Sequence, residues 1–320
     1  MIISDLDLYA RPQKRVRINR RRWINLLDLG EGGPSVVLCG GDHSTTLVWA
    51  RVHSKLARDF RVVAYDRAGL GFSDPGPFPR TTPRVVGDLR AALKAAGIAP
   101  PYVLVGASNG GFETRWFARH HPEEVVGMVL VDTAADDWTL RQQAAAPSWR
   151  PAWKNYLNQL RYVAACARSG ALRPGLAEYA QYVPEPNAQL PEALNLQRRD
   201  AALTAGYWRT HISECEAIET ASALGGPDTR ALLGDLPLVV LSAGLRSAPP
   251  LPTEEAEAFL ATLEAGQDAL AALSTRGVRR HVTDSGHNIQ IDRPEVVIGA
   301  VAEVIALAPT GRQPSTTPPR

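Results

Sequence analysis

The chain has 320 residues, and its 35 basic and 33 acidic side chains leave a net charge of +2, which gives no argument for a nucleic-acid partner. The three cysteines, Cys39, Cys166 and Cys215, are odd in number and widely spaced, so they suggest neither a disulfide framework nor a zinc site and fit a cytoplasmic protein. No apolar run approaches the roughly 20 residues of a membrane span, and the first residues lack the layout of a signal peptide.

Strands and helices alternate over the first 135 residues, a pattern that predicts a mostly parallel sheet with helices on both faces. We expect strands at 23–29, 35–39, 60–65, 102–105 and 126–131, and helices at 45–59, 82–96 and 112–120. Thr82 is expected to cap the second helix, because Pro83 suits a first helical position. Residues 137–235 show helical periodicity and no convincing strand. The alternation returns with strands at 236–241 and 278–282 and helices at 253–273 and 294–307.

These patterns predict an α/β core, 1–136 and 236–308, with an all-helical cap at 137–235 and a disordered tail at 309–320. The cap contains tryptophans and tyrosines but no phenylalanine. Rings with a polar group suit an apolar surface that water sometimes reaches, such as a substrate cleft under a lid. Packing of the cap on the core would explain most of these rings equally well.

A basic cluster lies near the start of the chain, at Arg11, Lys14, Arg15, Arg17, Arg20, Arg21 and Arg22. It could be read as a patch for a polyanion. However, Val16 and Ile18 alternate with basic residues, and another strand pattern follows. We therefore expect a hairpin at the sheet edge, where exposed charges discourage aggregation.

The most informative segment is Tyr102-Val-Leu-Val-Gly-Ala-Ser-Asn-Gly-Gly111, a β-branched run that ends in glycines before a helical pattern. A G-x-S-x-G sequence between a strand and a helix is typical of a nucleophile elbow. Small residues two positions before and after the serine, here Gly106 and Gly110, let the strand and the helix pass each other. The pattern predicts that Ser108 is a nucleophile raised above the sheet, although a glycine-rich turn with an incidental serine fits the motif alone.

A serine hydroxyl is a weak nucleophile and needs a base. We expect His287 to be that base, because it follows the last predicted strand and comes after the serine in the chain. His53 and His211 look like surface positions of helices, whereas His43 lies nearer the predicted site. The other three histidines are assigned to the end of the elbow helix and to the last strand: His120, His121 and His281.

A tetrahedral intermediate needs backbone donors for its oxyanion. The amide of Asn109, directly after the nucleophile, is one expected donor. Gly41, in the loop after the strand 35–39, is the other, because glycine lets the backbone approach a substrate. Cys39 ends that strand, and we expect its buried thiol to be inert.

With these motifs the chain resembles the α/β-hydrolase superfamily, and especially bacterial serine hydrolases that carry Tyr65-Asp-Arg-Ala-Gly-Leu-Gly-Phe-Ser-Asp-Pro75 and Ser285-Gly-His-Asn-Ile-Gln-Ile-Asp292. The resemblance covers nearly the whole length outside the tail. It implies a serine nucleophile and an α/β-hydrolase fold, but no particular substrate. The usual His-Gly before the oxyanion loop is replaced here by Cys39-Gly40, which keeps the needed amides.

The triad acid departs from the family pattern. Most members carry it after the strand matching 238–241, but 242–250 here contains no carboxylate before Glu254. Some relatives place the acid after the preceding strand, which implies Asp132 in this chain. Asp136 is the next candidate and Glu254 remains possible, whereas Asp284 is too close to His287 to turn onto its ring.

We therefore expect a serine hydrolase without cofactor or metal that cleaves an ester-like bond of a small, largely apolar molecule through an acyl-enzyme. Ser108 attacks, His287 transfers the proton and Asp132 orients the imidazole. Relatives that act on haloalkanes or epoxides carry aspartate at the elbow, which disfavours those reactions. Cleavage of a carbon–carbon or amide bond remains open, as does a non-catalytic binding protein of the same fold. The sequence does not indicate the oligomeric state.

Overall fold

The computed structural model describes residues 6–224 and 232–308. Their centre is an eight-stranded sheet with the order β1-β2-β4-β3-β5-β6-β7-β8. The strands are β1 (Lys14–Arg17), β2 (Trp23–Leu29), β3 (Ser35–Cys39), β4 (Val62–Tyr65), β5 (Tyr102–Ala107), β6 (Val125–Val131), β7 (Leu238–Ala243) and β8 (Gly277–Val282). Strands β4, β3, β5, β6, β7 and β8 pair in parallel, while β1 and β2 form an antiparallel edge. The predicted α/β fold is therefore confirmed.

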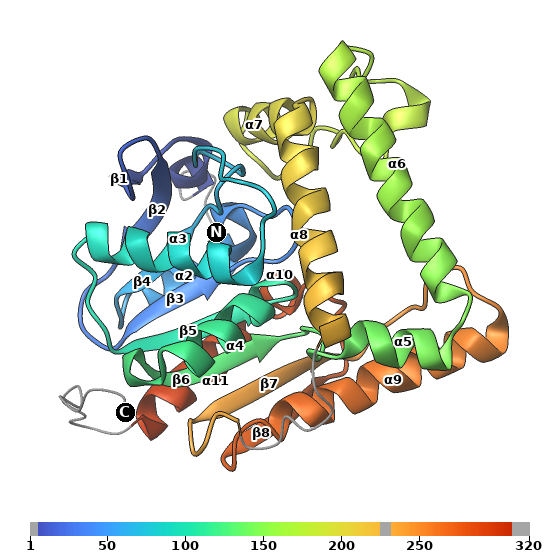
Figure 1. The fold of residues 1–320 in the computed structure, drawn as a ribbon. Helices are drawn as coiled ribbons and strands as arrows, with labels where there is room; N and C mark the ends of the chain where they lie inside the picture. Colours follow the sequence, from blue (N-terminus) through green and yellow to red (C-terminus); the bar gives the residue numbers. More distant parts are fainter. Residues whose placement is uncertain (1–5, 225–231, 309–320) are drawn as a thin grey trace.

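Helices cover both faces of this sheet (Figure 1). Alternate strand residues face two separate apolar cores, because side chains alternate across a strand. One core packs against α3 (Thr82–Ala95), α4 (Gly110–His120) and α9 (Thr253–Ala271). The other packs against α2 (Ala50–Leu56) and α11 (Pro294–Leu307). The short α10 (Ile289–Asp292) leads into α11.

The basic cluster forms the predicted edge hairpin. Val16 of β1 pairs with Ile24 of β2 and is buried, while Arg15 and Arg17 on either side are exposed. The start of one predicted helix and the cap residue of another differ from the structure. The helix expected at 45–59 begins as a 3-10 turn, Thr46–Trp49, and continues as α2. Thr81, and not Thr82, precedes α3, and its side chain makes no capping hydrogen bond.

The stretch from 137 to 224 contains α5 (Trp138–Ala145), α6 (Trp149–Ser169), α7 (Glu192–Ala202) and α8 (Ala205–Leu224), and no strand is found in it. Helices α6 and α8 pack through a third apolar core that includes Leu160, Val163 and Ile212. Figure 1 shows α7 and α8 beside the sheet and α6 farther out. The predicted disordered tail, 309–320, lies outside the described residues, as does part of the predicted cap at 225–231.

None of the helices described in 6–224 and 232–308 is both long and apolar enough to cross a membrane.

Candidate active site

The segment around Ser108 has the geometry of a sharp strand-to-helix turn. β5 ends at Ala107 and α4 begins at Gly110, with Ser108 at a φ of 50°. A Cβ on Gly106 would lie 2.5 Å from the Gly110 carbonyl oxygen, and one on Gly110 would lie 2.1 Å from the carbonyl oxygen of Cys39. Both positions therefore require glycine. A non-glycine residue in the left-handed region is strained, and such strain persists where neighbours hold it in place.

Neighbouring groups hold the backbone of Ser108 on both sides. Its amide donates to the Val131 carbonyl at 3.0 Å. Its carbonyl accepts hydrogen bonds from the Thr133 hydroxyl at 2.6 Å and the Gly111 amide at 3.0 Å. The strained turn is thus fixed to the end of β6 as well as to the start of α4.

Asp132 and His287 meet at the carboxyl ends of β6 and β8. The Asp132 Oδ2 lies 2.7 Å from the His287 Nδ1. The Asp132 side chain is 5% exposed, whereas that of His287 is 55% exposed. A buried acceptor thus orients an imidazole that is itself half exposed, which is the arrangement that a general base needs.

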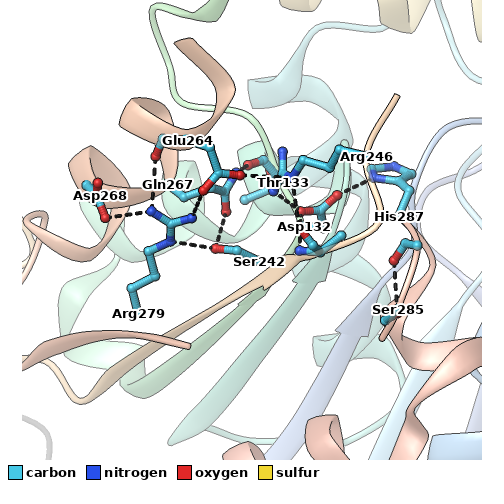
Figure 2. A network of polar contacts seen from close by, with 12 residues as sticks. Asp132, Thr133, Ser242, Arg246, Glu264, Gln267, Asp268, Arg279, Ser285 and His287 are labelled. Carbon is cyan, nitrogen blue, oxygen red and sulfur yellow. Dashed lines mark hydrogen bonds and ion pairs between the residues drawn. The ribbon is translucent and has the colours of Figure 1, made fainter. Parts of the chain in front are cut away.

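The segment after β7 is where the triad acid was first expected from the resemblance. Here it supplies hydrogen-bond donors to Asp132 and no carboxylate of its own. The Ala243 amide donates to the Asp132 Oδ1 at 2.9 Å, and the Arg246 guanidinium donates to the same oxygen. Figure 2 shows Arg246 and His287 on opposite sides of this carboxylate. Arg246 was not predicted from the sequence, where its only signal is a basic residue in the loop that lacks the usual carboxylate.

A second layer of side chains holds this corner together (Figure 2). The Gln267 amide of α9 donates to the Thr133 carbonyl at 2.6 Å, and the Ser242 hydroxyl donates to the Gln267 Oε1 at 3.3 Å. Arg279 of β8 donates to the Ser242 hydroxyl oxygen at 2.9 Å. The loop that carries Asp132 is therefore tied to β7, β8 and α9.

The other candidate acids lie elsewhere. Asp136 accepts two hydrogen bonds from Arg115, at 3.0 Å and 2.8 Å, and pairs with Arg119. Glu254 is exposed in the first turn of α9. Asp284 pairs with Arg293. Asp132 is the carboxylate that the structure places on the His287 ring.

Ser108 and His287 line one open pocket of about 1930 Å³. Its wall also contains residues 41–44, which we name the oxyanion loop after their expected role, and parts of α7 and α8, including Tyr207 and Trp208. No hydrogen bond joins the Ser108 hydroxyl to His287 among the contacts of the described residues. Catalytic hydrogen bonds are often loose in the absence of substrate and tighten when it binds.

Two histidines predicted to be on the surface are buried. His53 is 0% exposed and His211 is 1% exposed. Burial lowers the pKa of each to about 4. Neither lines the pocket with Ser108. The reason for the error with His211 is that α8 is covered on two sides, by α6 and by the core.

The two predicted oxyanion donors flank the serine. A Cβ on Gly41 would lie 3.0 Å from the Ser108 Cβ and 3.6 Å from its Oγ, so the Gly41 backbone passes close to the Ser108 side chain. Asn109 is the N-cap of α4, where the first amides of a helix have no acceptor within the helix. The positive end of the helix dipole also favours negative charge there.

Arg67 fixes the loop that carries Gly41. This buried guanidinium donates to the carbonyls of Gly40 and Gly41, both at 2.6 Å. It also donates to both carboxylate oxygens of Glu214 on α8, each at 3.0 Å. Glu113 lies 3.4 Å away, and burial raises the pKa of its carboxyl to about 7 although Arg67 favours the ionised form. Arg67 thus connects the oxyanion loop to the helical segment.

We expect Gly41→Ala to lower turnover by about 10²- to 10³-fold, the range for loss of one oxyanion donor. The new methyl group would press on Ser108 and move the loop. The φ of Gly41 is not positive, so the alanine adds no backbone strain of its own. Gly87→Ala in α3 is the matched control, because its Cβ would meet nothing within 4 Å. Initial rates with a p-nitrophenyl ester measure both. Equal activity of the two variants would contradict a role for the Gly41 backbone.

The chain matches a known protein family. The profile of the family described as "alpha/beta hydrolase fold" matches residues 34–244, which include Ser108 and Asp132 but not His287. A probable transporter of Hormonema carpetanum is 39% identical over 110 residues, which are 33% of this chain and 16% of that protein. The chain thus matches only a small part of this relative's length.

Longer matches are weaker in identity. The uncharacterized protein YqjL of Bacillus subtilis (strain 168) is 24% identical over 277 residues, covering 86% of this chain and 85% of that protein. The enol-lactonase from Burkholderia xenovorans LB400 superposes with a TM-score of 0.62 at 21% identity, covering 91% of this chain and 99% of that chain. The profile match spans more than half of the residues, and the chain therefore belongs to the alpha/beta hydrolase fold family.

Proposed function

We propose that the chain is a serine hydrolase that cleaves an ester-like bond of a small, largely apolar molecule through an acyl-enzyme. The observation that carries this proposal is the 2.7 Å contact between the buried Asp132 carboxylate and the His287 Nδ1, in a pocket that also exposes Ser108. The likeness to an enol-lactonase is consistent with it, since a lactone is a cyclic ester.

In the proposed mechanism, Ser108 attacks the substrate carbonyl while His287 takes its proton through Nε2. Asp132 holds the imidazole in the required tautomer and stabilises its charged form. The amides of Gly41 and Asn109 bind the oxyanion. His287 then returns the proton to the leaving group, and water, activated by the same histidine, releases the acyl group from Ser108. No cofactor takes part in these steps.

We further propose that the described part of the segment 137–235 forms a cap over the site. Residues of this segment, among them Tyr182, Leu190 and Trp208, share the pocket wall with Ser108. The size of the pocket leaves room for a substrate between these side chains and Ser108. The specificity for one ester would then depend mainly on the cap.

Labelling with a fluorophosphonate probe tests the proposal, because only an activated serine reacts with it. We expect stoichiometric labelling of Ser108, located by peptide mass spectrometry, and turnover of short p-nitrophenyl esters. A panel that also contains peptides and diketones separates ester cleavage from amide or carbon–carbon cleavage. A folded protein that neither reacts with the probe nor turns over any of these compounds would support a non-catalytic binding protein of this fold.

A further inference from the structure

A group of three potential metal ligands lies beside the active site but has no part in the proposed reaction. His211 and Cys215 are one turn apart on α8 and are 1% and 3% exposed. Residues four apart lie on one face of a helix. Asp42, which follows Gly41 in the oxyanion loop, completes the group, and one ligand atom from each residue lies within 4.8 Å of the others.

A second observation at Asp42 indicates that this group could hold a cation. Its Oδ1 is buried and has no hydrogen-bond partner among the described residues. A buried carboxylate oxygen without a partner is costly. The charge of Arg67 acts on Asp42, but this guanidinium already donates to Glu214 and to the carbonyls of Gly40 and Gly41. A cation at this position would satisfy the orphaned oxygen.

The spacing between His211 and Cys215 suits a shared ion. The Cys215 Sγ lies 3.8 Å from the His211 Nδ1 and 4.0 Å from its Nε2, and the Nε2 lies 3.1 Å from the Tyr156 hydroxyl. The thiol therefore lies beside the imidazole, so the ring or the thiol must turn for a nitrogen lone pair and the sulfur to meet one ion. Bond lengths to zinc of about 2.1 Å for nitrogen and 2.3 Å for sulfur put the two ligand atoms roughly 3.6 Å apart in a tetrahedral site, close to the observed spacing. Metal-bound histidines usually donate their second N–H to a neighbouring acceptor, and the Tyr156 oxygen is placed to accept it.

We propose that Asp42, His211 and Cys215 bind one divalent cation of the zinc class. A thiolate, an imidazole and a carboxylate together favour Zn²⁺ or Co²⁺ over Mg²⁺ or Ca²⁺, which prefer oxygen ligands alone. On binding, the thiol proton of Cys215 leaves to solvent and the sulfur bonds to the metal. The fourth position is left for water.

Such an ion would link helix α8 to the oxyanion loop through its protein ligands. His211 and Cys215 belong to α8, whereas Asp42 is adjacent to Gly41, where an added Cβ would lie 3.0 Å from the Ser108 Cβ. Arg67 and Glu214 make a second link between the same two parts. The proposal departs from the expectation, drawn from the spacing of the cysteines, that the chain has no zinc site, because Asp42 lies far from His211 and Cys215 in the sequence.

Binding of Co²⁺ to the chelator-treated full chain tests the proposal directly. We expect one equivalent of Co²⁺ to bind with a thiolate-to-cobalt charge-transfer absorption, and Zn²⁺ to displace it. Cys215→Ser should remove this absorption, and Asp42→Asn should weaken binding by at least about 100-fold. Tyr156→Phe, which removes only the partner of His211, should weaken binding by about 10- to 100-fold.

Two controls keep the result specific. Cys166→Ser removes another buried thiol, on α6, and should leave the absorption unchanged. His121→Ala disrupts a second possible metal group, His121 with Glu123 and Glu124, and should also have no effect. Circular dichroism confirms that each variant is folded. Absence of stoichiometric binding to the folded chain, or a charge-transfer band that persists in Cys215→Ser, would overturn the proposal. Neither readout depends on ester hydrolysis.

Discussion

Replacing Ser108 with alanine is expected to lower the turnover of a good ester by roughly 10⁴- to 10⁶-fold, because every later step follows from its attack on the carbonyl. The substitution removes one oxygen from a position whose backbone is held by Val131, Thr133 and Gly111. The hydroxyl itself has no hydrogen-bond partner to lose within the described residues. The fold should therefore remain, and the loss should appear in kcat and not in stability.

The measurement combines steady-state kinetics with thermal unfolding of the same preparations. Ser54→Ala is a matched control on α2, where the hydroxyl bonds only to the Ala50 carbonyl of its own helix. We expect this variant to retain normal turnover. If Ser108→Ala hydrolysed the ester at a rate near that of the unchanged protein, the proposed mechanism would be wrong.

The elements that the sequence predicted well are those specified by local pattern. The strand expected at 23–29 and the helix expected at 294–307 have those bounds in the structure. The turn at Ser108 could also be predicted, because the glycines that it requires are neighbours in the chain. His287 was predicted from its place after the last strand, and the structure puts its ring against Asp132.

The contacts that the sequence could not predict join segments that are far apart in the chain. Arg246 reaches Asp132, and Arg67 joins Glu214 to the oxyanion loop, only because the fold brings these groups together. The burial of His211 was missed for a related reason. Helix α8 places Ile212 and Cys215 in the apolar core that it shares with α6. Ser213 and Glu214 instead accept hydrogen bonds from Arg80 and Arg67 of the α/β part. The periodicity of α8 therefore shows no single buried face.

Asp132→Asn is expected to reduce the turnover of the folded protein by about 10⁴-fold, with some loss of stability because the largely buried Arg246 loses its anionic partner. An amide in this position can donate to the His287 Nδ1 and so favour the tautomer in which Nε2 is protonated, which cannot accept the proton of Ser108. It also removes the negative charge that stabilises the imidazolium. The buried environment of Asp132, at 5% exposure, makes this charge effective because solvent does not screen it. Steady-state kinetics should show the loss in kcat with a smaller change in KM.

Asp136→Asn is the comparison that identifies the acid, because this carboxylate also ends the β6 region but binds Arg115 and Arg119 instead of the histidine. This substitution leaves the buried Arg115 without its anionic partner, so some loss of stability is expected. Once the rates are corrected for the folded fraction, its effect on kcat should be far smaller than that of Asp132→Asn. Glu254→Gln, at an exposed site, should have no effect on either quantity. If Asp136→Asn or Glu254→Gln caused the larger loss of kcat in folded protein, the role of triad acid would pass from Asp132 to that residue. Ser108 and His287 would keep their assignments.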